Sequence, residues 1–300
     1  MSSTHWSESD LPNLKGHRIV ITGANSGIGR AAASALARAG ATVTLAVRDV
    51  ARGEAAAARM GGDVLVRQLD LADLSSVRSF VEGTHETFSV LIDNAGVMAV
   101  PEQRTIDGFE MQIGTNHLGH FALTNLLLPF ITDRVVVVSS ELHRRGHIDL
   151  GDLNWRTRRY RAWDAYAQSK LANLLFVLEL ERRLTCAGSP VRAVAVHPGY
   201  AATNLQSHTG RTVFSVMTAI GNRVVAQSDV KGALPTLYGA TVDVPGGSYV
   251  GPDGFRHMRG HPALGVASPR ALDVSMASRL WELSERLTGV PWGLDPTRGP

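Results

Sequence analysis

Short apolar runs and longer amphipathic segments alternate along most of the chain. The apolar runs predict seven strands, at residues 18–23, 41–47, 64–70, 90–96, 134–140, 191–199 and 247–254. Segments with helical spacing lie between them and after the last, at 29–40, 51–62, 73–88, 108–130, 163–184, 232–242 and 277–290. Strands this apolar are typical of a parallel sheet that is buried on both faces. The order therefore predicts an α/β fold, a Rossmann-type doubly wound parallel sheet of about seven strands with helices on both faces.

No linker, repeat or low-complexity tract divides the sequence, so we expect one domain. Residues 1–14 are expected to form a polar N-terminal lead-in, and residues 15–300 the single doubly wound domain. The pattern weakens at 204–231, where polar breaks interrupt apolar helical stretches. This segment is predicted either to cover a site or to form a surface helix pair.

Composition narrows the class of protein. The 300 residues are 44% hydrophobic and include one cysteine, Cys186, so no disulfide can form within the chain and a reducing cytoplasm is expected. The net charge of +3 and the single basic run at 156–161 do not indicate nucleic-acid binding. The polar N-terminus lacks the apolar core of a signal peptide, and the apolar run at 121–132 is too short to span a bilayer. We expect a soluble cytoplasmic protein.

The stretch TGANSGIG, Thr22 to Gly29, follows the first predicted strand and opens the first predicted helix. Gly23 can adopt backbone angles closed to other residues, and Gly27 and Gly29 let the backbone approach a pyrophosphate. The helix N-terminus supplies N–H donors and a partial positive charge for phosphates. The spacing differs from G-x-G-x-x-G, but its place at the start of a βαβ series predicts a dinucleotide-binding turn.

The second predicted strand ends in LAVRDV, at the place where an acidic residue would bind the ribose of NAD. Arg48 stands there, and a guanidinium suits a ribose 2′-phosphate, so NADP(H) is favoured over NAD(H). Asp49 either caps the next helix or turns inward, which would favour NAD(H). Asp70, at the end of the third predicted strand, either bonds the adenine or caps a turn.

Tyr166 and Lys170 stand four positions apart in the helix predicted over 163–184, so their side chains share one helix face. They are either a solvated pair or a chemically coupled one. A free phenol has a pKa of about 10, too high for an efficient base near neutrality. A nearby ammonium would lower that pKa.

Four motifs recur in a set order: TGANSGIG, DNAG at 93–96, the serines Ser139 and Ser140, and Tyr-x-x-x-Lys. In this combination the chain resembles the short-chain dehydrogenase/reductase superfamily, in its single-domain branch, from about residue 15 to the C-terminal helix. NHLGHF, SKLANLLF, VHPG and the long interval before the tyrosine are most similar to members of the retinol-dehydrogenase and protochlorophyllide-reductase type. The resemblance implies an NADP(H)-dependent oxidoreductase that interconverts a ketone or aldehyde and an alcohol by hydride transfer.

The resemblance also implies roles for individual residues. Tyr166 is the proton donor or acceptor, and Lys170 lowers its pKa and bonds the nicotinamide ribose. Ser140 orients the carbonyl, while Ser139, on the other side of the strand, points into supporting structure. Asn116 bends its helix and holds a water that relays protons to the lysine.

Cofactor contacts carry over by motif in the same way. The residues implied on the adenosine and pyrophosphate side are Gly23, Asn25, Ser26, Gly27, Ile28, Gly29 and Arg48. Asp70 contacts adenine, Asn94 and Gly96 the central ribose region, and Tyr166 and Lys170 the nicotinamide side. Pro198, Gly199 and Thr203 place the carboxamide. Asp93 replaces the family's usual first asparagine in this motif, and we expect only a local effect.

The long interval between Ser140 and Tyr166, filled by residues 143–163, is expected to form a surface excursion near the mouth of the active site. Members similar to retinol dehydrogenase carry a comparable insertion. The substrate is predicted to be a small apolar carbonyl or alcohol. Its pocket walls, or alternatively the core, would include Met98, Tyr200, Phe214, Met217 and Phe255.

A second class of protein has the same fold: a nucleotide-binding regulator or scaffold without turnover. It would lack one of Ser140, Tyr166 or Lys170, and all three are present. His117 and His120 have a spacing compatible with metal binding, but no third ligand accompanies them, so we expect core or interface histidines and no metal. By resemblance, the helix at 108–130 and the helix carrying Tyr166 pack across a two-fold axis, which implies a homodimer or homotetramer.

Overall fold

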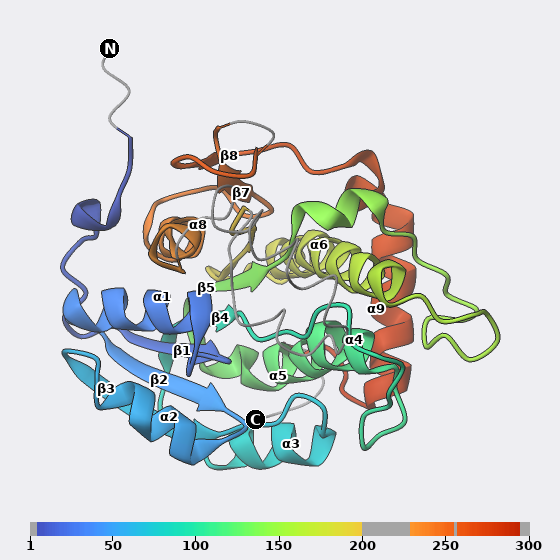
Figure 1. Cartoon of the computed structure of the whole chain (residues 1–300), viewed down its shortest axis with the longest axis horizontal. Helices are drawn as coiled ribbons and strands as arrows, with labels where there is room; N and C mark the ends of the chain where they lie inside the picture. Colours follow the sequence, from blue (N-terminus) through green and yellow to red (C-terminus); the bar gives the residue numbers. More distant parts are fainter. Residues whose placement is uncertain (1–4, 200–228, 255–256, 295–300) are drawn as a thin grey trace, which may run out of the picture.

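The computed structural model describes residues 5–199, 229–254 and 257–294. One sheet of eight strands organises these residues, in the order β3-β2-β1-β4-β5-β6-β7-β8 (Figure 1). The strands are β1 (Arg18–Thr22), β2 (Thr42–Val47), β3 (Asp63–Gln68), β4 (Phe88–Asp93), β5 (Ile131–Val138), β6 (Arg192–Val196), β7 (Tyr249–Pro252) and β8 (Pro262–Leu264). Every neighbouring pair is parallel except β7 and β8. The predicted doubly wound sheet is confirmed.

The strand missing from the sequence-based prediction is β8, a three-residue antiparallel edge strand. It is too short to carry a period of its own, and Leu264 on it is 59% exposed. The hydrophobic pattern of residues 262–264 does not distinguish a strand from a loop.

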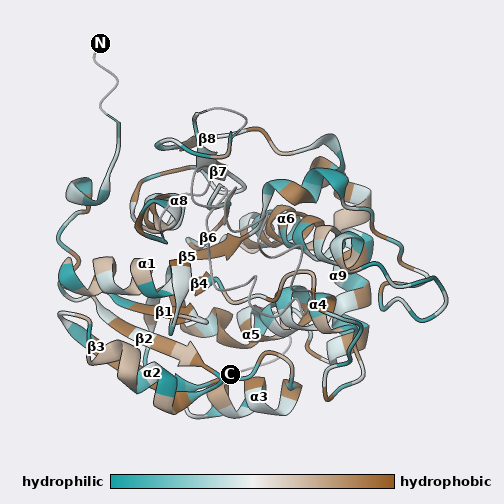
Figure 2. Ribbon diagram, viewed as in Figure 1, coloured by the Kyte–Doolittle hydropathy of each residue, from teal (hydrophilic) through white to brown (hydrophobic). Residues whose placement is uncertain are grey.

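The helices are α1 (Gly27–Arg38), α2 (Val50–Ala57), α3 (Leu74–Glu82), α4 (Met111–Ile113), α5 (Gly119–Leu127), α6 (Ala162–Cys186), α8 (Asp229–Thr241) and α9 (Val274–Thr288). Helices α1, α2 and α8 cover one face of the sheet, and α3, α5, α6 and α9 cover the other. Alternate strand residues face the two layers: Ile19 and Ile21 pack with α1, and Val20 packs on the opposite side. The brown strands in Figure 2 show this two-sided burial.

The predicted helix at 108–130 is interrupted in the structure. Glu110 caps α4 by accepting from the backbone N–H groups of Gln112 and Ile113. A π-helical turn, η2 (Gly114–Leu118), then contains Asn116, and α5 follows until Pro129 brings a 3-10 turn. A π-helical turn is frequent at functional sites, and this one bends the helix at the predicted asparagine.

Helix α9 lies on the outside of α5 and α6. Its Trp281 is 2% exposed and packs in the cluster formed with Phe121 of α5 and Phe176 of α6. The C-terminal helix α9 therefore covers part of the two helices that were expected to pack across a two-fold axis. None of the described helices combines the length and the apolar character that a bilayer crossing requires.

Candidate active site

The predicted motifs follow the carboxyl ends of β1, β2, β3, β4, β5 and β6, so they meet along one edge of the sheet. In an open parallel sheet this edge is where ligands bind, at the point where strand order reverses. Here the reversal lies between β1 and β4, which are neighbours in space but not in sequence.

The glycine-rich turn joins β1 to α1 and packs against the DNAG turn. Gly23 has a φ of 66°, and a Cβ there would lie 2.8 Å from the Cβ of Ala95. A Cβ on Gly29 would lie 2.3 Å from Nδ2 of Asn94. Both positions therefore require glycine for the two turns to approach each other.

The first turn of α1 directly follows the glycine-rich turn. Its N-cap, Ser26, makes no side-chain capping hydrogen bond, and Asn25 and Gly27 complete the half-buried turn. Ile28 points into the core beneath it. The N–H groups of this twelve-residue helix are thus available for a phosphate.

Thr22 ties the two turns together. Its hydroxyl accepts from the backbone N–H groups of Asn94 and Ala95, each at 2.9 Å, and lies 2.8 Å from Nε2 of His120. The Asn94 amide donates to the Thr22 carbonyl at 2.8 Å. Gly96 then passes close to two of the predicted site residues, because a Cβ there would lie 3.1 Å from Oδ1 of Asn116 and 3.6 Å from Nζ of Lys170.

The residues predicted to discriminate between cofactors lie at the ends of β2 and β3. Arg48 is exposed directly after β2. Asp49 caps α2 by accepting from the Arg52 N–H at 3.0 Å, so the capping alternative for this residue is the one observed. Asp70 accepts from the Ala72 N–H at 2.9 Å, and this contact closes a turn.

Tyr166 lies one turn inside the N-terminus of α6 and is 7% exposed. Burial raises the pKa of its phenol to about 12, and a hydrogen bond with the Ser140 side chain acts in the opposite direction. Ser140 also accepts from the Leu142 N–H at 3.3 Å. The serine and the tyrosine, distant in sequence, are therefore brought together as predicted.

Lys170 occupies the same face of α6 as Tyr166, with its Nζ 5.8 Å from the centroid of the tyrosine ring. The ammonium donates to the Val138 carbonyl at 2.9 Å, and burial lowers its pKa to about 8. The expectation that Lys170 lowers the pKa of Tyr166 stays a prediction, since burial and the Ser140 side chain are the causes of the shift in this structure. Desolvation of the phenol is the larger effect, and the ammonium is directed at a backbone carbonyl of β5.

Asn116 lies against both the DNAG turn and α6. Its Oδ1 accepts from the Val97 N–H at 2.8 Å, and its Nδ2 donates to the Val97 carbonyl and to Oγ of Ser169, each at 2.9 Å. Ser139 points away from Ser140 and donates to the Lys170 carbonyl at 2.8 Å. The two serines thus make different contacts: Ser139 with the backbone of α6, and Ser140 with the Tyr166 side chain.

The nicotinamide end of the predicted site is described in part. Pro198 and Gly199 are half-buried after β6, and the Gly199 N–H donates to Nδ1 of His197 at 3.3 Å. Thr203 and the segment 204–231 up to residue 228 lie outside the described residues, as do Tyr200, Phe214, Met217 and Phe255.

His117 and His120 are core histidines of this chain. His117 lies 3.0 Å from Oγ of Ser284 on α9, and His120 bridges Thr22 and the Asn116 carbonyl. Burial lowers the pKa of each to about 3. Among the described residues no group of three or more His, Cys, Asp or Glu side chains could hold a metal ion.

Asp93, the departure from the usual motif, is fully enclosed behind the DNAG turn. Its Oδ2 accepts from the Thr124 hydroxyl at 2.8 Å, and burial raises its pKa to about 8. Its Oδ1 has no partner within the part of the chain that the structure describes. An aspartate at this position therefore introduces a buried carboxyl with a raised pKa. The described hydrogen bond of that carboxyl is a local one, to Thr124.

The excursion at 143–163 is partly packed against the domain and partly exposed. Asp152 accepts from the N–H groups of Arg156, Thr157 and Arg158, and these bonds lower its pKa to about 2 against the effect of burial. The guanidinium of Arg158 lies 3.8 Å above the ring of Trp155. Arg156 and Arg158 of the basic run at 156–161 thus stabilise this loop.

Sequence reasoning missed the side chains behind Ser140. Glu141 accepts from the Tyr249 hydroxyl at 3.2 Å, and His143 lies 2.8 Å from the Ser140 carbonyl. Their partners come from β7 and the C-terminal segment, so no local motif indicates them. The sequence around His143 indicates no more than a loop position.

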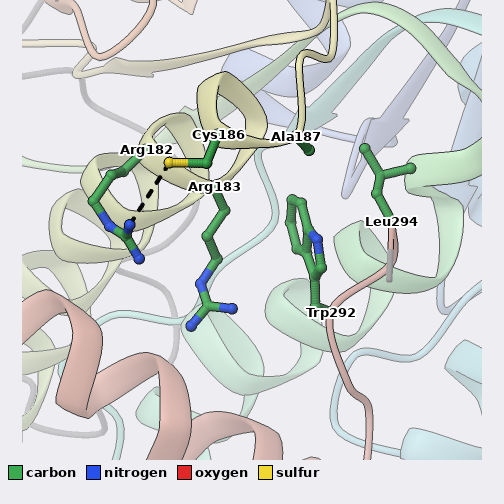
Figure 3. A pocket seen from close by; sticks show the side chains of 6 residues that line it. All are labelled: Arg182, Arg183, Cys186, Ala187, Trp292 and Leu294. Carbon is green, nitrogen blue, oxygen red and sulfur yellow. Dashed lines mark hydrogen bonds between the residues drawn. The ribbon is translucent and has the colours of Figure 1, made fainter. Parts of the chain in front are cut away.

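A surface cavity of about 380 Å³ lies apart from this site, at the C-terminal end of α6 (Figure 3). Arg182 and Arg183 line it with Cys186, and both guanidinium groups are paired with Glu179. Arg182 also donates to the Cys186 sulfur at 3.9 Å. None of the predicted site residues lines this cavity.

The fold and the ordered motifs define a family. The sequence matches the short chain dehydrogenase family over residues 17–213, and the chain belongs to that family. It is an oxidoreductase family whose members use a nicotinamide nucleotide.

Individual relatives match over nearly the whole chain. Retinol dehydrogenase 13 of Homo sapiens is 43% identical, and the match covers 92% of this chain and 86% of the relative. Retinol dehydrogenase 14 of Mus musculus is 39% identical, over 92% and 87%. The solved structure of an uncharacterised protein from Mycobacterium paratuberculosis is 55% identical, with a TM-score of 0.86 over 97% of this chain and all of that chain.

Proposed function

We propose that this protein is an NADP(H)-dependent oxidoreductase that interconverts an apolar ketone or aldehyde and the corresponding alcohol. The observation that carries the proposal is the convergence of Ser140, Tyr166 and Lys170 beside Gly96 of the DNAG turn. Family membership and the retinol dehydrogenase relatives support the same class of reaction.

The residues present fit a dinucleotide. Gly23 and Gly29 let the glycine-rich turn pack closely on the DNAG turn, and the N-terminus of α1, which has no side-chain cap hydrogen bond from Ser26, suits the pyrophosphate. Asn94, Gly96 and Lys170 would hold the ribose on the nicotinamide side, and Pro198 and Gly199, with Thr203, the carboxamide. When bound, the nicotinamide supplies or accepts the hydride.

Tyr166 supplies the proton in the reductive direction. With a pKa raised to about 12, its phenol is protonated at neutral pH and can donate to a carbonyl oxygen. The Ser140 hydroxyl orients that oxygen and stabilises the negative charge that develops on it. Oxidation would require Tyr166 to give up its proton first, so the buried phenol favours reduction.

Lys170 supplies a positive charge beside the buried phenol of Tyr166. Its ammonium lies 5.8 Å from the phenol ring centroid, close enough to stabilise a phenolate as the proton leaves. Asn116 contacts Ser169 next to it and would hold the water that returns a proton to this pair.

The preference for NADP(H) rests on Arg48, which is exposed at the end of β2 while Asp49 is engaged as a helix cap. We expect Arg48→Ala to weaken NADPH binding by about 10- to 100-fold, because a charge-assisted contact to phosphate is lost. Binding of NADH should change little. Fluorescence titration of both cofactors measures the two effects, and equal losses for both would contradict the role of Arg48.

The substrate side is predicted to be apolar. Trp163 is 55% exposed and lies edge-on to Tyr166, with ring centroids 6.5 Å apart. The relatives named as retinol dehydrogenases act, by name, on an apolar alcohol, and we extend that class to this chain without naming the compound. A homodimer or homotetramer remains a prediction, and it needs a surface other than the face under α9.

The proposal is tested by NADPH consumption over a panel of aldehydes and ketones, with Tyr166→Phe as the matched variant and NADH in parallel. We expect turnover that prefers NADPH and is lost in the variant, whose phenyl ring fills the same space without a proton to donate. A protein that binds NADPH but turns over no member of the panel would favour the regulatory or scaffold function.

A further inference from the structure

His143 links the catalytic serine to the C-terminal part of the chain. It lies in a 3-10 helix, η4 (Glu141–Arg145), whose N-cap is Ser140, and its side chain is fully buried. Its Nδ1 lies 2.8 Å from the Ser140 carbonyl, and the Ser268 N–H donates to its Nε2 at 3.1 Å. Ser268 precedes η7 (Pro269–Leu272), more than a hundred residues away in sequence.

These two contacts fix where the proton of the imidazole lies. A backbone N–H can only donate, so Nε2 of His143 is an acceptor and carries no hydrogen. In the neutral ring the hydrogen is then on Nδ1, which donates to the Ser140 carbonyl. Burial lowers the pKa of His143 and so favours this neutral form.

The Ser140 carbonyl receives a second hydrogen bond from the His143 backbone N–H, at 2.9 Å. One residue thus uses both its main-chain and its side-chain donor on the backbone of the serine whose hydroxyl bonds Tyr166. The ring of His143 also packs edge-on against Tyr249, with centroids 5.5 Å apart, so its orientation is fixed from the sheet side.

We propose that His143 is a positioning residue that holds the backbone of Ser140 so that its hydroxyl faces Tyr166. The inference rests on the proposed function, in which Ser140 contacts the substrate carbonyl. A displacement of a catalytic group by about 1 Å can cost roughly 100-fold in rate, so loss of this bond should appear in turnover before it appears in cofactor binding.

Two substitutions separate positioning from packing. The first is His143→Asn, in which the side-chain amide nitrogen is attached to Cγ as Nδ1 of the imidazole is, so it can still donate to the Ser140 carbonyl. The second is His143→Phe, which keeps a ring against Tyr249 and loses the donor. The control is His147→Phe, at an exposed histidine of the same loop.

The experiment measures kcat and KM with a reactive aldehyde, NADPH binding by fluorescence, and the melting temperature of each variant. We expect kcat to fall by about 10- to 100-fold in His143→Phe and to be largely recovered in His143→Asn, with NADPH affinity unchanged in both. A packing role predicts the opposite order, because phenylalanine fills the space better than asparagine, and that order would overturn the inference.

The Ser140→Ala variant distinguishes this inference from the proposed function. If Ser140→Ala leaves kcat unchanged, the assigned role of the serine fails, and the inference fails with it. If Ser140→Ala lowers kcat while both His143 variants match the wild-type protein, only the inference is overturned. Where residual activity permits, His143→Phe should cost little more in the Ser140→Ala background, because both changes act through one hydroxyl.

Discussion

Burial sets the chemistry of the two side chains at the centre of the site. It raises the pKa of Tyr166 to about 12 and lowers that of Lys170 to about 8, so both groups shift toward their neutral forms. At neutral pH the phenol keeps its proton and the lysine is mostly an ammonium. The state that suits carbonyl reduction therefore exists below pH 8 and is lost when Lys170 deprotonates.

We expect kcat/KM for reduction to fall as the pH rises through about 8, because the ammonium is lost there while Tyr166 remains protonated. In Lys170→Arg, whose guanidinium stays charged, any residual activity should lose this descending limb. A rate that stays constant to about pH 10 in the wild-type protein would contradict this assignment.

Motif spacing was sufficient to predict Ser140, Tyr166, Lys170 and Asn116 as site residues, because each belongs to a local pattern that the sequence displays directly. The same patterns cannot predict a pKa shift, since burial depends on residues from several elements. The expected effect of Lys170 on Tyr166 stays a prediction for this reason. His143 was missed because its partner, Ser268, is distant in sequence.

At the scale of elements, apolar periodicity located the strands β1 to β7 and the main helices, but not where two helices end or bend. Gly83 caps α3 before the predicted end, and the π-helical turn divides the predicted helix at 108–130. Side-chain period alone does not distinguish a π-helical turn from α-helix. The packing of α9 onto α5 and α6 also requires tertiary information.

Helix α9 is predicted to be held mainly by Trp281. The indole stacks on Phe176 with centroids 5.6 Å apart and is nearly perpendicular to Phe121 at 4.9 Å. Trp281→Ala should lower the free energy of unfolding by about 3–5 kcal/mol in urea titration, because it leaves a large cavity.

Trp281→Phe is the matched control. Its loss should be smaller, since the indole N–H has no hydrogen-bond partner among the described residues and little polar contact is given up. Equal losses in the two variants would show that ring packing is not what holds α9.

At the scale of the whole molecule, the fold buries several titratable groups whose effects on the pH dependence of stability have opposite signs. His117 and His120 keep pKa values of about 3 and His197 of about 4, whereas Asp93 is raised to about 8. Below about pH 6.5 these histidines bind protons in the unfolded protein but stay neutral in the folded one, so falling pH favours unfolding. Asp93 has the reverse effect, since the folded protein binds its proton between about pH 4 and 8.

We therefore expect stability to be highest near about pH 6.5 and to fall toward pH 5, because the lowered pKa values of four buried histidines, His143 included, outweigh the raised pKa values of Asp93 and Glu110 in that range. Each histidine contributes a slope of about 1.4 kcal/mol per pH unit. Urea unfolding at pH 5, 6 and 7 measures this slope. Unchanged stability between pH 7 and pH 5 would contradict the buried neutral state of these rings.

Asp93→Asn provides the test for the opposing group. The amide cannot ionise, so the variant should be more stable than the wild-type protein above pH 7, where the buried carboxyl is costly, by roughly 1–3 kcal/mol. Below about pH 4 the difference should shrink, because the carboxyl is then protonated in both states. A variant that is less stable than the wild-type protein at pH 8 would show that the Asp93 carboxylate is stabilised in the fold.

The central claim is that Tyr166 protonates a carbonyl to which hydride is delivered at this site. The most direct measurement supplies NADPH deuterated at nicotinamide C4, on the transferred face, and analyses the product alcohol by mass spectrometry. The account predicts one deuterium on the former carbonyl carbon with the wild-type protein and no product with Tyr166→Phe. Product without deuterium, or labelled product at an undiminished rate in Tyr166→Phe, would contradict it.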